Sequence, residues 1–165
     1  MSEGTGAEHE VYMRLALEQA ALAQSQGEVP VGAIVVQGGV AIGRGYNQPI
    51  AACDPTAHAE IVALRQAGRT ASNYRLTGAT LYATVEPCLM CIGAIIHARL
   101  GTLVFGAPDP KAGAVRSLLD VSALPLNHSV SVVEGVLAEE CGEILRDFFR
   151  SRRRSDSLGP EEPLR

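Results

Sequence analysis

Two short motifs hold the side chains of this sequence that could do metal chemistry. His58 and Glu60 lie in a His-Ala-Glu sequence, and Cys88 and Cys91 lie in a Pro-Cys-Leu-Met-Cys sequence. One imidazole and two thiolates give zinc three protein ligands and leave a fourth position for water, as in catalytic zinc sites. Bound zinc lowers the pKa of its water to about 7, and a nearby carboxylate can carry the released proton. We therefore predict a zinc centre with ligands His58, Cys88 and Cys91, and Glu60 as proton carrier.

Both motifs are expected where helices begin. Pro87 precedes Cys88, and Cys91 follows three positions later, so the two thiols would share one face of a helix. The Asp-Pro-Thr sequence at 54–56 offers an N-cap and a proline at the first helical position, which places His58 in the first turn of another helix. The positive ends of two helix dipoles would then favour the thiolate forms that bind zinc.

Each motif has simpler interpretations when it is taken alone. A lone histidine is usually a surface or core residue, and a Cys-x-x-Cys pair can be a redox pair or half of a structural zinc site. A structural site needs a fourth protein ligand, and the remaining cysteines, Cys53 and Cys141, are isolated. Glutamate two residues after histidine, together with proline directly before cysteine, completes the signature of zinc-dependent nucleobase deaminases.

Hydrophobic periodicity and turn residues predict helices alternating with strands. Helices are expected at 8–26, 57–67, 87–99 and 137–153, with a short one at 115–120, and strands at 31–36, 40–46, 80–85, 102–105 and 129–134. The last two strands are far enough apart in sequence for a crossover, so they can be parallel. No repeat or linker divides the chain. We expect one deaminase domain over 1–154 and a disordered tail over 155–165.

Composition limits the kind of protein without identifying it. A chain of 165 residues, 47% of them hydrophobic, can form one domain with a substantial core. The longest apolar run is much shorter than the ~20 residues of a membrane span, so we expect no membrane association, a cytoplasmic location and reduced cysteines. The net charge of −4 argues against a nonspecific nucleic-acid coat. RNA binding would need a local patch, for which the final helix offers arginines: Arg146, Arg150, Arg152, Arg153 and Arg154.

Over approximately 8–153 the sequence resembles the bacterial tRNA-specific adenosine deaminases. Besides the zinc motifs, the resemblance rests on Asn47, Asn73-Tyr74-Arg75-Leu76, Phe105-Gly106-Ala107, Asp109, Lys111, Gly113-Ala114, Asn127-His128 and Phe148-Phe149-Arg150. It implies an α/β protein with the three-layer α/β/α cytidine-deaminase-like fold and a five-stranded mixed sheet. It further implies one zinc ion per subunit, a homodimer, and conversion of the wobble adenosine of an arginine tRNA with anticodon ACG to inosine.

The same resemblance implies roles for residues outside the zinc motifs. Asn47 would read the base, and Val29 and Pro30 would wall its pocket. Residues expected to contact the anticodon stem-loop are Asp109, Lys111, Asn127, His128, Phe148, Phe149 and Arg150. Ile95 and Ile96 are possible dimer contacts, although a buried core helix would have the same pattern.

The sequence also departs from the family pattern in one loop. Asp109 is flanked by Pro108 and Pro110, and Arg116 stands where the family usually has glycine. If that glycine adopts a left-handed conformation, Arg116 would cost about 1 kcal/mol or more.

Two alternatives to tRNA editing remain open. One is a deaminase of a free base or nucleotide, such as guanine or cytosine, and the other is a noncatalytic RNA-binding subunit. The Asp109–Lys111 loop and the arginine-rich final helix argue against the first alternative, and Glu60 argues against the second.

Overall fold

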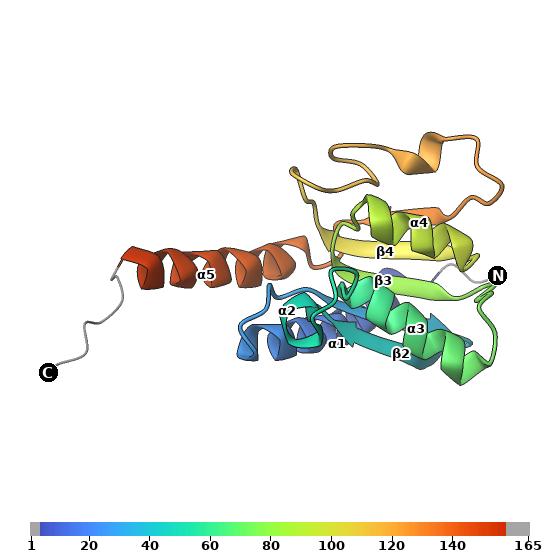
Figure 1. The fold of residues 1–165 in the computed structure, drawn as a ribbon. Coiled ribbons are helices and arrows are strands. Elements are labelled where there is room, and N and C mark those ends of the chain that lie inside the picture. Colours follow the sequence, from blue (N-terminus) through green and yellow to red (C-terminus); the bar gives the residue numbers. More distant parts are fainter. Residues whose placement is uncertain (1–3, 158–165) are drawn as a thin grey trace, which may run out of the picture.

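A five-stranded mixed sheet forms the centre of the molecule (Figure 1), as the computed structural model shows for residues 4–157. Its strands follow the order β2-β1-β3-β4-β5. They are β1 (Gly32–Gln37), β2 (Val40–Tyr46), β3 (Thr80–Val85), β4 (Thr102–Ala107) and β5 (Ser131–Glu134). β1 is antiparallel to both β2 and β3, whereas β3, β4 and β5 run parallel. The predicted mixed sheet is confirmed, including the parallel last pair.

Helices cover both faces of this sheet. α1 (Gly6–Ser25) and the beginning of α5 (Ala138–Ser157) lie on one face, while α3 (Ala59–Ala71) and α4 (Leu89–His97) lie on the other (Figure 1). Most of α5 projects beyond the sheet. The three-layer α/β/α arrangement predicted from the sequence is therefore confirmed.

Alternation along the strands builds two apolar layers, as expected when successive side chains point to opposite faces. Ile34, Tyr82 and Val104 are buried with Met13 of α1 and Cys141 of α5. Their neighbours on the same strands point the other way and are buried with residues of α3 and α4. These neighbours are Ala33, Val35, Leu81, Ala83, Leu103 and Phe105. Burial on both faces explains the strands' continuous apolar runs.

Two glycines of β2 let α3 lie directly on the sheet. A methyl group on Gly43 would overlap the Ala63 carbonyl oxygen, and one on Gly45 would overlap that of Ala59. Because the obstacles are backbone atoms, no side-chain rotation could make room. The first turns of α3, which follow His58, can thus lie close to β2 only because Gly43 and Gly45 have no side chains.

Some boundaries differ from the sequence-based expectations. The predicted helix at 115–120 is wrong: that segment forms turns, and a short 3-10 helix, η1 (Val121–Ala123), follows it. An unpredicted short helix, α2 (Pro49–Ala52), lies before the His58 motif. α5 continues to Ser157, so 155–157 are helical instead of disordered, and 158–165 lie outside the described residues. Within 4–157, no helix combines the length and apolar character of a membrane span.

Candidate metal centre and active site

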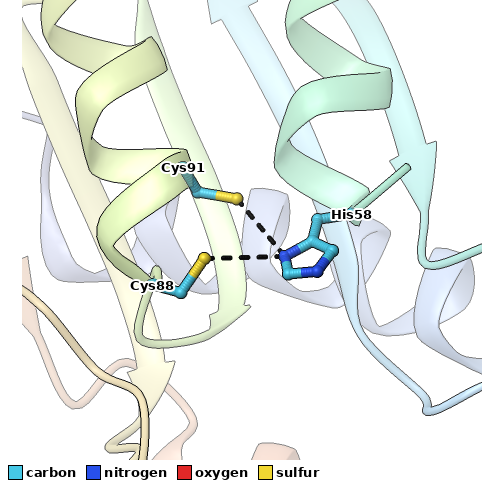
Figure 2. A group of neighbouring side chains, drawn as sticks. All are labelled: His58, Cys88 and Cys91. Atoms are coloured by element: carbon cyan, nitrogen blue, oxygen red, sulfur yellow. Dashed lines mark hydrogen bonds between the residues drawn. The ribbon is translucent and has the colours of Figure 1, made fainter. Parts of the chain in front are cut away.

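The three predicted metal ligands meet between the starts of α3 and α4. His58 Nδ1 lies 3.6 Å from the Sγ atom of Cys88 and 3.6 Å from that of Cys91 (Figure 2). Zinc bonds of about 2.3 Å to sulfur and about 2.0–2.1 Å to nitrogen, held at a tetrahedral angle, would separate sulfur and nitrogen by about 3.6 Å. All three donor atoms lie within 4.8 Å of one another. The spacing and the donor types both fit one tetrahedral zinc ion.

Two of the three predicted ligands sit at helix N-caps, and the third lies in a first turn. His58 is the N-cap of α3 and Cys88 the N-cap of α4, with Cys91 in the first turn that follows. The expectation that proline opens each helix was therefore wrong. At 54–56, Asp54 Oδ1 accepts the Thr56 backbone N–H at 2.8 Å, which closes a separate turn before the helix begins. The two N-termini still face the same centre.

Hydrogen bonding distributes the protons within the ligand set. A hydrogen bond from Cys91, aided by His58, lowers the pKa of Cys88 to about 3, which favours the thiolate form of Cys88. The same hydrogen bond, together with burial, raises the pKa of the Cys91 thiol. The bond with Cys88 also raises the pKa of His58. A metal binds the neutral imidazole and the thiolates, so protons compete with it for these side chains and binding is pH-dependent.

Glu60 lies beside this centre in the first turn of α3. Its side chain is buried, and Oε2 is 3.5 Å from Cys91 Sγ. Burial raises the pKa of Glu60, which makes the protonated carboxylic acid accessible closer to neutral pH. A carboxyl group that can exist in both forms beside a metal position is suited to accepting and returning a proton.

A neighbouring segment places Asn47, Val29 and Pro30 near the ligands. The Asn47 backbone N–H donates to the Val31 carbonyl at 3.0 Å, next to the Val29–Pro30 pair. The following residue, Gln48, donates to the Ala57 carbonyl at 3.0 Å, directly before His58. Asn47 thus lies between the expected pocket wall and the metal ligand.

Glu28, which the sequence did not single out, holds the segment after Asn47 in place. Its buried carboxylate accepts the backbone N–H groups of Ile50 and Ala51, each at 3.1 Å, at the start of α2. Because both of its partners are backbone groups, no pattern of side chains in the sequence indicates this role of Glu28.

The loop after β4 is organised by a second residue that was missed, Glu86. Its buried carboxylate accepts hydrogen bonds from the backbones of Asp109, Val115, Arg116 and Ser117. Burial opposes ionisation, but the hydrogen bonds, that of the Ser117 hydroxyl foremost, outweigh it and lower the pKa of Glu86 to about 2.

Arg116 causes none of the backbone strain that its position suggested. Within 4–157 the non-glycine residues of positive φ are Cys53, Ser72, Arg99 and Leu137. Arg116 is not one of them, so a left-handed glycine is not required there. Its guanidinium instead contacts Asp120 and Glu134.

Lys111 and α5 border a groove of about 420 Å³. Its lining comprises Lys111, Leu145, Arg146, Phe149, Arg150 and Arg153. Phe149 is 44% exposed, whereas Phe148 is 7% exposed and packs edge-on against it. Of the predicted RNA-contacting residues, the structure thus brings Lys111, Phe149 and Arg150 together. It turns Phe148 inward.

The arginines of α5 are not equally available for a ligand. Arg146 pairs with Glu139 and Arg150 with Asp147, both at exposed sites where such pairs contribute little. Arg152 lies over the Phe148 ring, 5.0 Å from its centroid, and donates to the Gly27 carbonyl. Arg152 therefore attaches α5 to the segment that leads to Val29 and Pro30.

Asn127 and His128 lie apart from the metal ligands, at the other end of α4. Asn127 Oδ1 accepts a hydrogen bond from Arg99 at 3.0 Å, and His128 Nε2 is 2.7 Å from the Leu100 carbonyl oxygen. Both contacts follow the C-terminus of α4, whereas Cys88 is its N-cap. Within one chain these two residues are not brought together with the centre.

Comparison with known proteins places the fold and the centre in one family. A family model described as MafB19-like deaminase matches residues 7–153. The tRNA-specific adenosine deaminase of Haemophilus influenzae is 49% identical over 151 residues, which are 90% of this chain and 87% of that protein. The Bacillus subtilis enzyme of the same name is 43% identical over 146 residues, 88% and 91% of the two chains.

The chain belongs to the tRNA-specific adenosine deaminase family.

Solved structures agree with this membership and show a second relative on the same fold. A structure from a study of A-to-I editing by tRNA:A34 deaminases at the tRNA wobble position has a TM-score of 0.79 and 44% identity, and covers 81% of this chain and 98% of that one. A guanine deaminase from Nitrosomonas europaea has a TM-score of 0.71 and 26% identity, and covers 84% and 83%. The tRNA-specific adenosine deaminase family thus shares its architecture with an enzyme that acts on a free base.

Proposed function

We propose that this chain converts the wobble adenosine of an arginine tRNA with anticodon ACG to inosine, releasing ammonia. The observation that carries the proposal is the tetrahedral spacing of His58, Cys88 and Cys91 with the buried Glu60 beside it. Membership of the tRNA-specific adenosine deaminase family supports adenosine in tRNA as the substrate.

Metal binding and proton transfer in a hydrolytic deamination are assigned to different residues of the site. A zinc ion held by the three ligands would supply a bound water of lowered pKa and polarise it for attack. Glu60 takes the proton from the water that attacks C6 of the adenine. It gives this proton to the ring nitrogen, then takes the second proton from the new C6 hydroxyl and delivers it to the amino group, which leaves as ammonia. Burial of Glu60 favours the neutral stage of this cycle.

The adenine would be bound by the segment between Glu28 and Ala57. The Asn47 side-chain amide has a donor and an acceptor and suits the edge of the base. Val29 and Pro30 would wall the pocket. Hydrogen bonds from Asn47 to Val31 and from Gln48 to Ala57 hold these groups near His58 and support the assignment. Because C6 is inaccessible in a stacked base, the target adenosine has to leave its stack to reach the centre.

The anticodon stem-loop would lie along the groove between Lys111 and α5. Phe149 offers an exposed ring for stacking, and Lys111, Arg150 and Arg153 offer positive charge to phosphates. Among the described residues, Asp109 uses only Oδ1 in hydrogen bonds, to the backbones of Lys111 and Ala112. Its other oxygen is our candidate for reading a ribose hydroxyl. The buried Phe148 ring packs edge-on against Phe149 and so supports its position.

We also propose a homodimer, although not through Ile95 and Ile96, which are buried in the core. Exposed apolar side chains at the start of α4 and in the loop after β4 are better candidates: Leu89, Leu118 and Leu119. A dimer could also bring Asn127 and His128 of one chain to the RNA bound by another. Sedimentation of the wild type and of Leu89→Glu tests this: a monomeric wild type would refute the dimer. We further infer a cytoplasmic location, where the tRNA substrate would be found.

The deciding experiment offers the purified, zinc-loaded protein a synthetic arginine anticodon stem-loop with ACG, beside free adenosine, cytidine and guanine. Inosine at the wobble position alone is the expected result. Conversion of a free base without the stem-loop would instead favour a free-base deaminase, which the fold shared with guanine deaminase permits. RNA binding without any conversion would favour a noncatalytic subunit.

A further inference from the structure

Glu86 lies two residues before Cys88 and gathers five hydrogen-bond donors from a loop far along the chain. Its Oε1 accepts the backbone N–H groups of Val115, Arg116 and Ser117 at 3.1, 2.6 and 2.8 Å. Its Oε2 accepts the Asp109 backbone N–H at 3.0 Å and the Ser117 hydroxyl at 2.5 Å. Both oxygens of this 2% exposed carboxylate are therefore engaged by one loop.

The Glu86 charge is balanced by polar groups alone. No ion pair among residues 4–157 involves Glu86. Converging N–H groups can hold an anion in a concave nest of backbone, which is how phosphates are often bound. Here the bound anion is the protein's own Glu86 carboxylate, and the backbone of the 109–117 loop surrounds it. A buried charge solvated this way is costly to disturb, because each donor would lose a charged acceptor.

Backbone contacts hold the same loop against the metal-ligand turn. Gly113 and Cys88 form an antiparallel bridge, and the Ala114 N–H donates to the Pro87 carbonyl at 2.9 Å. A methyl group on Gly113 would overlap the Glu86 carboxylate. The loop thus reaches so close to Glu86 that glycine is needed there.

The chain of contacts ends at groups expected to touch RNA. Glu86 binds the Asp109 backbone, and Asp109 Oδ1 in turn accepts the backbone N–H groups of Lys111 and Ala112 at 3.1 and 3.2 Å. Lys111 borders the groove along α5. One carboxylate therefore connects a metal ligand, two residues away in sequence, with the loop that forms one wall of the groove.

We propose that Glu86 is a positioning residue that fixes the 109–117 loop relative to the metal ligands and so sets the affinity for the RNA substrate. This inference rests on the proposed function, because it takes the groove to be the RNA site. Glu86 itself does not touch the reacting atoms. Its loss should weaken binding of the stem-loop more than it slows the chemical step at His58, Cys88, Cys91 and Glu60.

Glu86→Gln tests the proposal with almost no change in volume. In this variant an amide N–H group, which is itself a donor, replaces one of the two accepting oxygens of Glu86. The donors that bind this oxygen lose their acceptor, so part of the nest must open. We expect KM for the stem-loop to rise at least about tenfold, with kcat within about threefold of wild type and zinc content unchanged. Asp120→Asn is the matched control, since Asp120 is a carboxylate just beyond the loop that binds Ser122, Ala123 and the Arg116 guanidinium but none of the five donors to Glu86. It should leave KM unchanged.

Amide hydrogen exchange gives a second readout that does not depend on turnover. In the wild type the N–H groups of Val115, Arg116 and Ser117 should be protected, and in Glu86→Gln they should exchange faster while β3 and α4 stay protected. Equal protection in both proteins, or an unchanged KM, would overturn the proposal. Loss of zinc together with a fall in kcat would also overturn it, because Glu86 would then serve the metal centre or the fold as a whole.

Ser117→Ala keeps the test decisive if Glu86→Gln does not fold. It removes only the hydroxyl donor to Oε2 and should raise KM by a smaller factor, about threefold, at full zinc content. A wild-type KM in this variant, with Glu86→Gln unfolded, would reject the positioning role. If the wild type makes no inosine, the proposed function fails, whereas amide exchange still reports whether Glu86 anchors the loop.

Discussion

Cys91 Sγ lies 3.5 Å from Glu60 Oε2, so a predicted metal ligand and the expected proton carrier are in contact within one buried site. They belong to different helices, α4 and α3, whose first turns meet there. Glu60 is not one of the three donor residues, so this carboxylate can be changed by mutation without removing any of them.

Glu60→Gln should abolish most turnover and leave the metal in place. The amide cannot accept and return a proton, and general acid–base catalysis is worth about a hundredfold to ten-thousandfold in rate. We expect kcat to fall by about that factor, with zinc content measured by atomic absorption equal to wild type. Glu10→Gln, on the exposed side of α1, is the control and should behave as wild type. Retention of wild-type kcat by Glu60→Gln would remove Glu60 from the mechanism.

Metal removal should make the Cys88 thiol available for alkylation. Cys53 is exposed and should react with iodoacetamide under all native conditions. Cys141 is fully buried, and burial raises its pKa to about 12, so it should resist until the protein unfolds. Cys88, which is partly exposed and has a lowered pKa, should react only after chelation, whereas the buried Cys91, whose pKa is raised, should resist like Cys141. Peptide mass spectrometry before and after chelation distinguishes the four, and equal labelling of Cys88 in both samples would contradict its role as a ligand.

Stability should fall at high pH through Tyr82. Burial raises the pKa of Tyr82 to about 12, and its hydroxyl lies 3.0 Å from His9 Nδ1. The folded state therefore holds this proton more tightly than the unfolded chain, whose tyrosine titrates near 10. The stabilisation is complete below about pH 10 and is lost as the pH rises towards about 12, by up to about 2 kcal/mol. Thermal melting from pH 8 to 11.5 measures the slope, which should be shallower in Tyr82→Phe.

Lys111→Ala should weaken stem-loop binding and reduce its dependence on salt. A cation that contacts one phosphate of a single strand contributes about −0.7 to the slope of log K against log salt. Titrating the stem-loop at several salt concentrations measures that slope. Arg69→Ala is the control, because Arg69 lies in the last turn of α3, away from the His58 end of that helix. An effect of equal size in both variants would mean that the charge acts through the overall field and not through the groove.

Residue type and spacing were sufficient to predict that His58, Cys88 and Cys91 come together as a group that could hold a metal ion, because zinc accepts few donors and the two motifs contain them. The same information misplaced the helix starts by a few residues. Proline at 55 and 87 suggested first helical positions, but a side-chain turn at Asp54 and the N-cap conformations of His58 and Cys88 delay both helices. Local preference does not specify which residue of a turn becomes the cap.

Residues whose partners are backbone atoms could not be found in the same way. Glu28 and Glu86 look like ordinary acidic residues in the sequence, and only the fold brings distant N–H groups to their carboxylates. Arg116 illustrates the opposite error. Comparison with a family pattern suggested strain, whereas the actual backbone at that position has no need of glycine.

The contact of Gly43 and Gly45 with α3 has a consequence for how substitutions in this chain should be interpreted. Any side chain at these positions must push α3 off β2, and Glu60 moves with the helix. In a survey that replaces every position and scores only inosine formation, both glycines would be as intolerant as a zinc ligand. Intolerance alone would therefore place two chemically inert residues in the active site. Only zinc content and folding, measured on the same variants, would separate the residues that do chemistry from those that leave space for it.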